Sequence, residues 1–232
     1  MLGHNAYGQL GSPTGDAGTG SPVPLTVQGS SNVTAVTAGS YHTCALLSGG
    51  IVQCWGLNFD GELGNGTTTS SSTPVAVSSL RGATAITAGY NHTCALLSDG
   101  TVQCWGLNAV GQLGSQSVDG GRGSLVPLTV QGLSNVTAMS AGGYHTCALL
   151  SGGSVRCWGS NQYGELGNGM AGTPGFPPVA VSGLNSATAI GAGEEHSCAI
   201  LSSGAAECWG GDGSGQLGDG TMISSSTPVA VR

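Results

Sequence analysis

The stretch HTCALLSGGIVQCWG, residues 42–56, decides the fold because the chain repeats it. The further copies are HTCALLSDGTVQCWG from His92, HTCALLSGGSVRCWG from His145 and HSCAILSSGAAECWG from His196. Successive histidines are therefore 50, 53 and 51 residues apart. A regular period of this length predicts a solenoid or a propeller, in which each repeat is completed by its neighbours.

A second motif follows each copy and completes the repeat. Its copies are GHNAYGQLG at Gly3, GLNFDGELG at Gly56, GLNAVGQLG at Gly106, GSNQYGELG at Gly159 and GGDGSGQLG at Gly210. We divide the chain into repeats 3–56, 57–106, 107–159 and 160–210 with a half repeat 211–232, as one propeller segment over residues 1–232. Because both ends fall inside a repeat, we expect the chain to be a piece of a longer protein.

One repeat contains four short runs with the composition of β-strands. They are PVAV (74–77), TAITAG (84–89), HTCALL (92–97) and TVQCWG (101–106). Gly, Ser and Asn bound these runs, which are too short for helices. Four antiparallel strands per repeat are typical of a propeller blade. The predicted fold class is all-β: a β-propeller of four-stranded antiparallel blades, forming a partial or open ring of about four to five blades.

Charge and hydropathy exclude two classes of partner. The net charge is −7, the chain has no lysine, and its four arginines lie far apart. Nothing in the sequence therefore forms the basic stripe that nucleic acid requires. No apolar run approaches the roughly 18 residues that span a bilayer, so we expect no membrane insertion. The first residues, MLGHNAYGQLG, lack the features of a signal peptide, so any secretion signal lies outside this chain.

The pattern GxxHTCALLSxGxVxCWGxNxxGQLG resembles the regulator of chromosome condensation repeat family over nearly the whole chain. The resemblance implies a circular β-propeller, usually of about seven blades, that acts through protein contacts. The eukaryotic founder exchanges guanine nucleotide on a small nuclear GTPase and docks on chromatin. A bacterial branch includes secreted β-lactamase inhibitors. Guanine-nucleotide exchange and enzyme inhibition are therefore the alternatives to a plain binding scaffold.

The cysteines pair within each repeat. If the hairpin around residues 48–50 is symmetric, Leu47 faces Ile51 and Cys44 faces Cys54. Opposed residues have Cα atoms roughly 4.5 to 5.5 Å apart, within the range of about 4.4 to 6.8 Å that a disulfide tolerates. All eight cysteines pair in this way: Cys44 with Cys54, Cys94 with Cys104, Cys147 with Cys157, and Cys198 with Cys208. We predict one disulfide per blade and an extracellular or cell-surface location.

Metal and redox chemistry are weaker interpretations of the same residues. His42, Cys44 and Cys54 point to one face and would form an open zinc set, but no fourth ligand recurs in register. The spacing C-x9-C is not the adjacent pair of a redox centre. The stretch GGDGSG, residues 210–215, lacks the acidic ladder of a calcium loop. We therefore expect no metal and no cofactor.

No residue pattern indicates catalysis. The acidic residues do not recur as a facing pair, and there is no nucleophile elbow. A histidine that returns in every blade is more typical of a fixed hydrogen-bonding element than of a catalyst. We expect no enzymatic activity, and we assign structural roles to His42, His92, His145, His196, Trp55, Trp105, Trp158 and Trp209.

Strand direction predicts where a binding surface lies. The Gly-x-x-His and Asn-x-x-Gly turns should share one face of the propeller, and the Ser-Gly-Gly hairpin tips the other. The two residues before each histidine differ between copies, and every tyrosine lies in one of these turns. Rigidly held aromatic residues commonly anchor protein interfaces, although tyrosines here could equally cover the ends of the core.

We therefore predict a non-catalytic extracellular or cell-surface scaffold that binds a protein, or alternatively a glycan, through this face. The predicted binding residues are Tyr7, Tyr41, Phe59, Tyr90, Asn91, Tyr144, Tyr163, Glu194 and Glu195.

Overall fold

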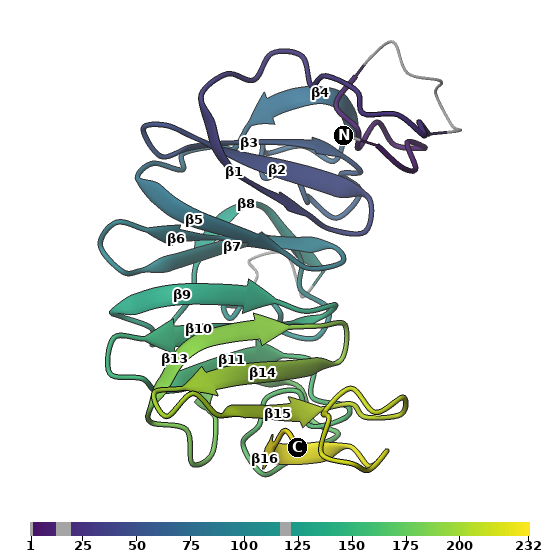
Figure 1. Cartoon of the computed structure of the whole chain (residues 1–232). Coiled ribbons are helices and arrows are strands. Elements are labelled where there is room, and N and C mark those ends of the chain that lie inside the picture. The colour runs from purple at the N-terminus through teal and green to yellow at the C-terminus, as the bar shows by residue number, and fades with distance from the viewer. Residues whose placement is uncertain (1, 13–19, 117–121) are drawn as a thin grey trace. The chain divides into compact units, whose positions relative to one another are not determined.

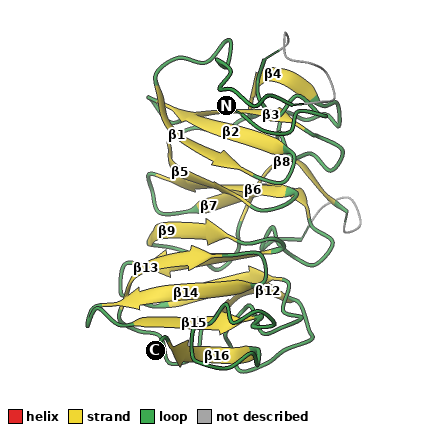
Figure 2. Cartoon of the chain, turned by 45° about the vertical axis from the view of Figure 1, so that its right-hand side comes forward, coloured by secondary structure: helices red, strands yellow, loops and turns green. Residues whose placement is uncertain are grey.

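The computed structural model describes residues 2–12, 20–116 and 122–232, which form sixteen β-strands and no helix (Figure 1). None of these residues therefore belongs to a helix that could cross a membrane. The strands form four antiparallel sheets of four, and within each sheet the spatial order follows the chain order (Figure 2). Each sheet has the strand number and pairing of a propeller blade, as the sequence predicts, and is called a blade below.

The strand bounds repeat closely from blade to blade. The first blade holds β1 (Val33–Ala38), β2 (His42–Leu47), β3 (Ile51–Gly56) and β4 (Ser71–Ala76). The second holds β5 (Ala83–Ala88), β6 (His92–Leu97), β7 (Val102–Leu107) and β8 (Gly123–Thr129). The third holds β9 (Val136–Ala141), β10 (His145–Leu150), β11 (Val155–Gly159) and β12 (Gly175–Ala180). The fourth holds β13 (Ala187–Ala192), β14 (His196–Leu201), β15 (Ala206–Gly210) and β16 (Ser225–Ala230).

The chain divides into two compact units. Unit 1 comprises residues 1–98, 103–108 and 117–128, and so contains the first blade and most of the second. Unit 2 comprises residues 99–102, 109–116 and 129–232, and so contains the third and fourth blades. Each unit is described by itself below.

The sequence-based grouping of strands is wrong in one respect. The run around Pro74 does not begin the blade that contains residues 84–106. Strand β4 instead pairs with β3, with Cys54 opposite Val75, and is the last strand of the first blade. Proline lacks a backbone N–H and therefore suits such an edge strand. The strands of each blade thus come from two successive predicted repeats. The predicted repeats divide the sequence but do not correspond to blades.

The hairpin register and the disulfides are confirmed. Cys44 pairs with Cys54 and Leu47 with Ile51 between β2 and β3. The four predicted disulfides are all present, each between neighbouring strands of one blade, and no cysteine is free. Their Cα–Cα distances of 4.0 to 4.1 Å are slightly shorter than expected. Each bridge therefore staples one blade internally and does not join two blades.

A tryptophan in each blade holds that blade to the preceding copy of the Gly-Gln-Leu-Gly motif. The indole Nε1–H of Trp105 donates a 2.9 Å hydrogen bond to the main-chain carbonyl of Glu62. The same bond, at 2.9 Å, runs from Trp55 to Gln9, from Trp158 to Gln112 and from Trp209 to Glu165. All four indoles are buried. A Cβ at Gly64 would lie 2.8 Å from the Trp105 Nε1 atom, so the motif requires glycine there.

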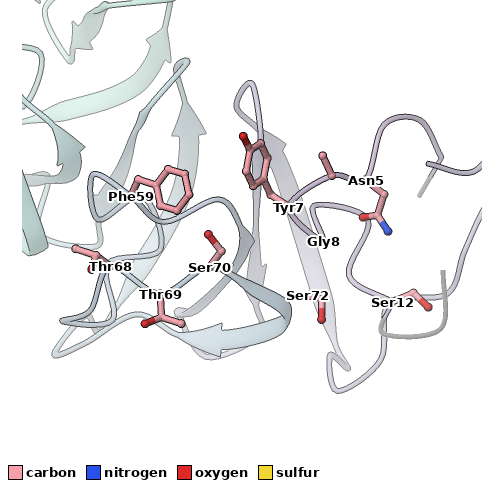
Figure 3. Close-up of a pocket in the computed structure, with 10 residues that line it drawn as sticks. Asn5, Tyr7, Gly8, Ser12, Phe59, Thr68, Thr69, Ser70 and Ser72 are labelled. Atoms are coloured by element: carbon pink, nitrogen blue, oxygen red, sulfur yellow. The ribbon is translucent and has the colours of Figure 1, made fainter. Parts of the chain in front are cut away.

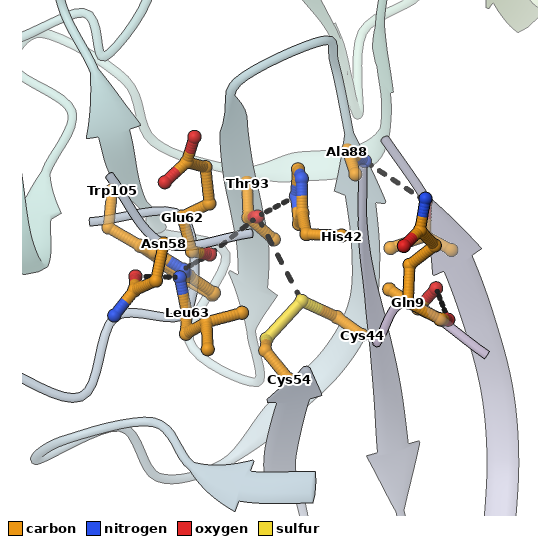
Figure 4. The surroundings of a disulfide bond; sticks show 12 residues. Gln9, His42, Cys44, Cys54, Asn58, Glu62, Leu63, Ala88, Thr93 and Trp105 are labelled. Carbon is orange, nitrogen blue, oxygen red and sulfur yellow. Dashed lines mark hydrogen bonds between the residues drawn. A yellow bond between two sulfur atoms is a disulfide. The ribbon is translucent and has the colours of Figure 1, made fainter. Parts of the chain in front are cut away.

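The repeated histidine adds a second bond between blades of one unit. His42 Nε2 lies 2.8 Å from the Thr93 hydroxyl, which lies between it and Cys44 (Figure 4). Because the Thr93 hydroxyl donates to the carbonyl of Glu62, its oxygen accepts from His42. A Cβ at Gly39 would collide with the His42 ring, which explains the glycine three residues before the histidine. In unit 2, His145 Nε2 lies 2.8 Å from the Ser197 hydroxyl.

Burial keeps these histidines neutral. Desolvation lowers the pKa of His42 from 6.5 to about 4. Desolvation, followed by the nearby charge of His196, lowers the pKa of His145 to about 4. His92 is also buried, whereas His196 is only half-buried. The buried rings therefore act as uncharged hydrogen-bonding parts of the blade interfaces.

We predict that the double variant Cys147→Ala/Cys157→Ala loses roughly 2 to 3 kcal/mol of unfolding free energy, because the unfolded chain is no longer constrained by the bridge. Urea denaturation of wild type and variant measures the difference. Ser151→Ala, at the exposed tip of the same loop, serves as the control and should match wild type. A double variant as stable as wild type would show that the bridge contributes nothing.

We predict that acid destabilises the fold before it protonates the buried histidines. In the unfolded chain the histidine side chains bind protons near pH 6.5, whereas His42 and His145 in the folded protein bind them only near pH 4. Stability from these groups is therefore complete above pH 6.5 and falls as the pH drops to 4, by roughly 3 kcal/mol per histidine. Urea denaturation between pH 7 and 4.5 should show a smaller loss for His42→Gln/His145→Gln than for wild type. An identical loss in both proteins would contradict this assignment.

Candidate functional site

The two variable turns of the first blade lie at the same end of that blade. Pairing of His42 with Gly56 places the turn before β2 beside the turn after β3. The main-chain N–H of Leu57 donates to the carbonyl of Tyr41 at 2.8 Å and joins the two turns. We call this end of unit 1 its turn end.

Four aromatic rings gather at the turn end of unit 1. The centroid of the Tyr7 ring lies 5.4 Å from that of Tyr41 and 5.9 Å from that of Phe59, both in edge-to-face geometry. The ring of His4 lies 6.0 Å from that of Tyr41. Tyr7 comes from the first motif copy, which starts at Gly3, so residues far apart in the chain build one cluster. His4 is not among the binding residues predicted from the sequence, because its position in the Gly-x-Asn motif holds Leu, Leu, Ser and Gly in the other copies.

These rings are displayed to solvent as well as packed against one another. Tyr7 is 37%, Tyr41 42% and Phe59 64% exposed. A ring that serves only to close the core would be largely buried, as the four tryptophans are. The cluster is therefore a preorganised aromatic surface.

A groove of about 600 Å³ has the rings of Tyr7 and Phe59 among its lining residues (Figure 3). We call it the Tyr7–Phe59 groove. The groove is lined by small hydroxyl side chains as well as by the two rings, namely Thr68, Thr69, Ser70 and Ser72. A Cβ at Gly8 would collide with Ser72, so glycine lets the two segments meet at this wall. Among the described residues, none of the lining side chains is charged.

A second, smaller groove lies on the other side of Phe59. Its volume is about 230 Å³, and Asp60, Arg122 and Leu125 contribute to its walls. It is the next copy of the same feature, because Asp60 occupies the motif position of Tyr7, and Gly61 approaches Leu125 as Gly8 approaches Ser72. The fold thus repeats the groove while the sequence changes its chemistry.

Tyr90 and Asn91 make hydrogen bonds to other residues of unit 1. The Asn91 side-chain amide donates a 3.1 Å hydrogen bond to the buried carboxylate of Glu62. The carbonyl of Tyr90 accepts from the N–H of Ser40, and its side chain is half-buried. Burial is the main influence on Glu62 and raises its pKa. These contacts favour a supporting role for Asn91, and its predicted part in binding stays a prediction.

The remaining predicted binding residues lie in unit 2. Tyr144 is 41% and Tyr163 37% exposed, and Glu194 and Glu195 are also exposed. Partial desolvation is the main cause of a raised pKa at Glu195, and the negative charges of Glu194 and Glu165 add to it. The surface of unit 2 therefore combines tyrosine with acidic groups, in contrast to the neutral Tyr7–Phe59 groove.

The arrangement in unit 1 suits binding. It offers exposed ring faces, ring edges and hydroxyl groups held by paired strands. Within the described ranges, no three His, Cys, Asp or Glu side chains gather where they could hold a metal ion. The one histidine in the cluster, His4, lies within 3.1 Å of the Gln9 side-chain amide through its Nδ1 atom.

Comparison with known families identifies the repeat. Two profiles, both described as the regulator of chromosome condensation (RCC1) repeat, match the chain. One matches residues 33–62, 83–112, 136–165 and 187–216. The other matches residues 1–46, 50–96, 99–149 and 152–200. Neither profile describes a catalytic domain.

Curated relatives share these repeats. The chain is 33% identical over 203 residues to the ultraviolet-B receptor UVR8 of Arabidopsis thaliana, an alignment that covers 86% of this chain and 34% of the receptor. It is 34% identical over 115 residues to the mitochondrial RCC1 domain-containing protein RUG3 of the same plant, covering 48% of this chain and 26% of that protein. The chain therefore spans about a third or less of these relatives.

Solved structures show the same fold. Human WBSCR16 superposes with a TM-score of 0.88 at 25% identity, covering all of this chain and 61% of that one. Yeast RCC1 (Prp20), solved bound to Kap60, superposes with a TM-score of 0.83 at 24% identity, covering 94% of this chain and 53% of that one. Together with the repeat matches along the chain, this likeness shows that the protein belongs to the regulator of chromosome condensation (RCC1) repeat family.

Proposed function

We propose that this chain is a non-catalytic interaction module that binds a protein partner through the turn end of unit 1. The observation that carries the proposal is the exposed cluster of Tyr7, Tyr41 and Phe59 beside a preformed groove. Aromatic side chains with few rotatable bonds lose little entropy on binding and are enriched among residues that dominate interface energies.

The family supports a role in protein binding. A structure of a related protein is described as yeast RCC1 bound to Kap60, and another reports the binding of yeast Prp20p to Gsp1p and histones. These partners belong to those proteins. Guanine-nucleotide exchange and enzyme inhibition are the alternatives for this chain, and each also requires a protein-binding surface.

We further propose that the module works outside the cell or at its surface. The support is the cysteine usage: all eight cysteines form disulfides, each closing a short hairpin within one blade. Complete pairing is typical of proteins from oxidising compartments. The aromatic cluster would then meet extracellular proteins.

The test compares the effect on partner binding of substitutions in the aromatic cluster with that of a substitution at an exposed apolar residue elsewhere. Immobilised wild-type protein captures a partner from the surface and secreted proteins of the organism that makes it. The affinity of wild type and of each variant for that purified partner is then measured. We expect the triple variant Tyr7→Ser/Tyr41→Ser/Phe59→Ser to weaken binding at least about 100-fold. Ile51→Ser is the matched control, because Ile51 is 42% exposed beside the hairpin tip of the same blade. Wild-type affinity in the triple variant, or an equal loss in the control, would move the site elsewhere.

A further inference from the structure

We propose that the Tyr7–Phe59 groove binds a neutral sugar ring. The inference deepens the proposed function, because it rests on a binding role for the turn end of unit 1 and names the chemical group recognised there. The same sugar chemistry could be presented by a free oligosaccharide or by a glycan attached to a protein.

The aromatic walls match the apolar face of a sugar. The rings of Tyr7 and Phe59 pack edge to face against each other, inclined at 81°, and both line the groove. Phe59 is the more exposed of the two. An aromatic face carries partial negative charge, and the polarised C–H groups of a sugar ring pack against such a face. In Figure 3 both rings flank the groove, with the hydroxyl side chains beside them.

The hydroxyl side chains match the polar edge of a sugar. Among the described residues, the hydroxyls of Thr68, Thr69 and Ser72 have no hydrogen-bond partner, although all three line the groove. Each hydroxyl can donate and accept, as each sugar hydroxyl can. Ser70 differs, because its hydroxyl already accepts a 3.2 Å hydrogen bond from the N–H of Asn58. The groove therefore offers several free donors and acceptors around an aromatic wall.

The charge and size of the groove favour a neutral ligand of a few sugar rings. None of the lining side chains that the structure describes carries a charge, so none of them would compensate a phosphate, a carboxylate or a basic side chain. Its volume of about 600 Å³ falls within the usual range for small-ligand sites. Peptide recognition usually uses backbone pairing at a strand edge or charged side chains, whereas hydroxyl side chains and rings dominate here.

The neighbouring groove has the same backbone shape but a different chemistry. At the equivalent positions it has Asp60 in place of Tyr7 and Leu125 in place of Ser72, and Arg122 adds a second charge. The backbone shape recurs, but the neutral aromatic and hydroxyl lining does not. The sugar site is therefore assigned to the Tyr7–Phe59 groove and not to its neighbour.

The test titrates the whole chain with neutral trisaccharides, observed by saturation-transfer NMR and calorimetry. The probes are cellotriose, maltotriose, mannotriose and chitotriose, each to about 10 mM, with trigalacturonic acid as the anionic comparison. We expect at least one neutral probe to bind, Phe59→Ala to weaken it at least about tenfold, and Thr68→Val to weaken it a few-fold. Ile51→Ala is the control, because Ile51 is 42% exposed beside the hairpin tip of the first blade and does not line the groove; it should bind as wild type does.

Three results would overturn the inference: no neutral probe binding to folded protein, binding unaffected by Phe59→Ala, or equal binding of the anionic trimer. A carrier protein with neutral mannose-type glycans, tested before and after enzymatic removal of the glycans, distinguishes the two sources of sugar. Binding lost on deglycosylation supports a protein-attached glycan, and a bound trisaccharide without binding of either carrier form supports a free oligosaccharide. Equal, measurable binding of both carrier forms contradicts sugar recognition. These titrations need no protein partner. If no neutral trisaccharide binds but a protein partner binds wild type and not the triple variant, the sugar site is overturned and the proposed function stands.

Discussion

The hydrogen bond from each tryptophan indole to the main-chain carbonyl of the preceding Gln or Glu is the constraint on which the rest of each unit depends. In unit 1, the Trp105 indole is buried and donates to Glu62, while Gly64 provides the space in which the indole lies. A buried N–H or carbonyl left unpaired destabilises the folded state, because it has lost its hydrogen bonds to water. The bond therefore fixes the position of the turn that contains Glu62. Phe59 and Asp60 are in that turn.

Different positions of the repeat serve stability and recognition. The positions that repeat without change, such as the tryptophan, the cysteines and the second glycine of Gly-Gln-Leu-Gly, hold each blade together and to its neighbour within a unit. The positions that vary lie in turns fixed by those bonds, and they give successive grooves different chemistry. A repeated scaffold can thus present a neutral aromatic groove beside a charged one without altering the backbone.

Much of the fold could be predicted from the sequence, because local patterns carry it. The spacing of Cys44 and Cys54 fixed the hairpin register and the disulfide. The partner of the Pro74 strand was predicted wrongly, because pairing across the long loop of residues 57–70 leaves no local signal. The turns were predicted to be variable, but the contact of His4 with Tyr41 and the hydroxyl lining of the groove depend on residues distant in sequence.

Hydrogen exchange and unfolding of Trp105→Phe test this bond, because the variant keeps an aromatic ring at the buried position and removes the indole N–H. If the indole bond holds the turn, the variant loses about 1 to 3 kcal/mol in unfolding free energy. We also expect faster amide exchange in residues 58–64, where the N–H of Leu63 is bonded to Asn58, with unchanged exchange in the disulfide-bonded hairpin of residues 42–56. Wild-type stability together with wild-type exchange in residues 58–64 would contradict the claim that the indole bond holds the turn.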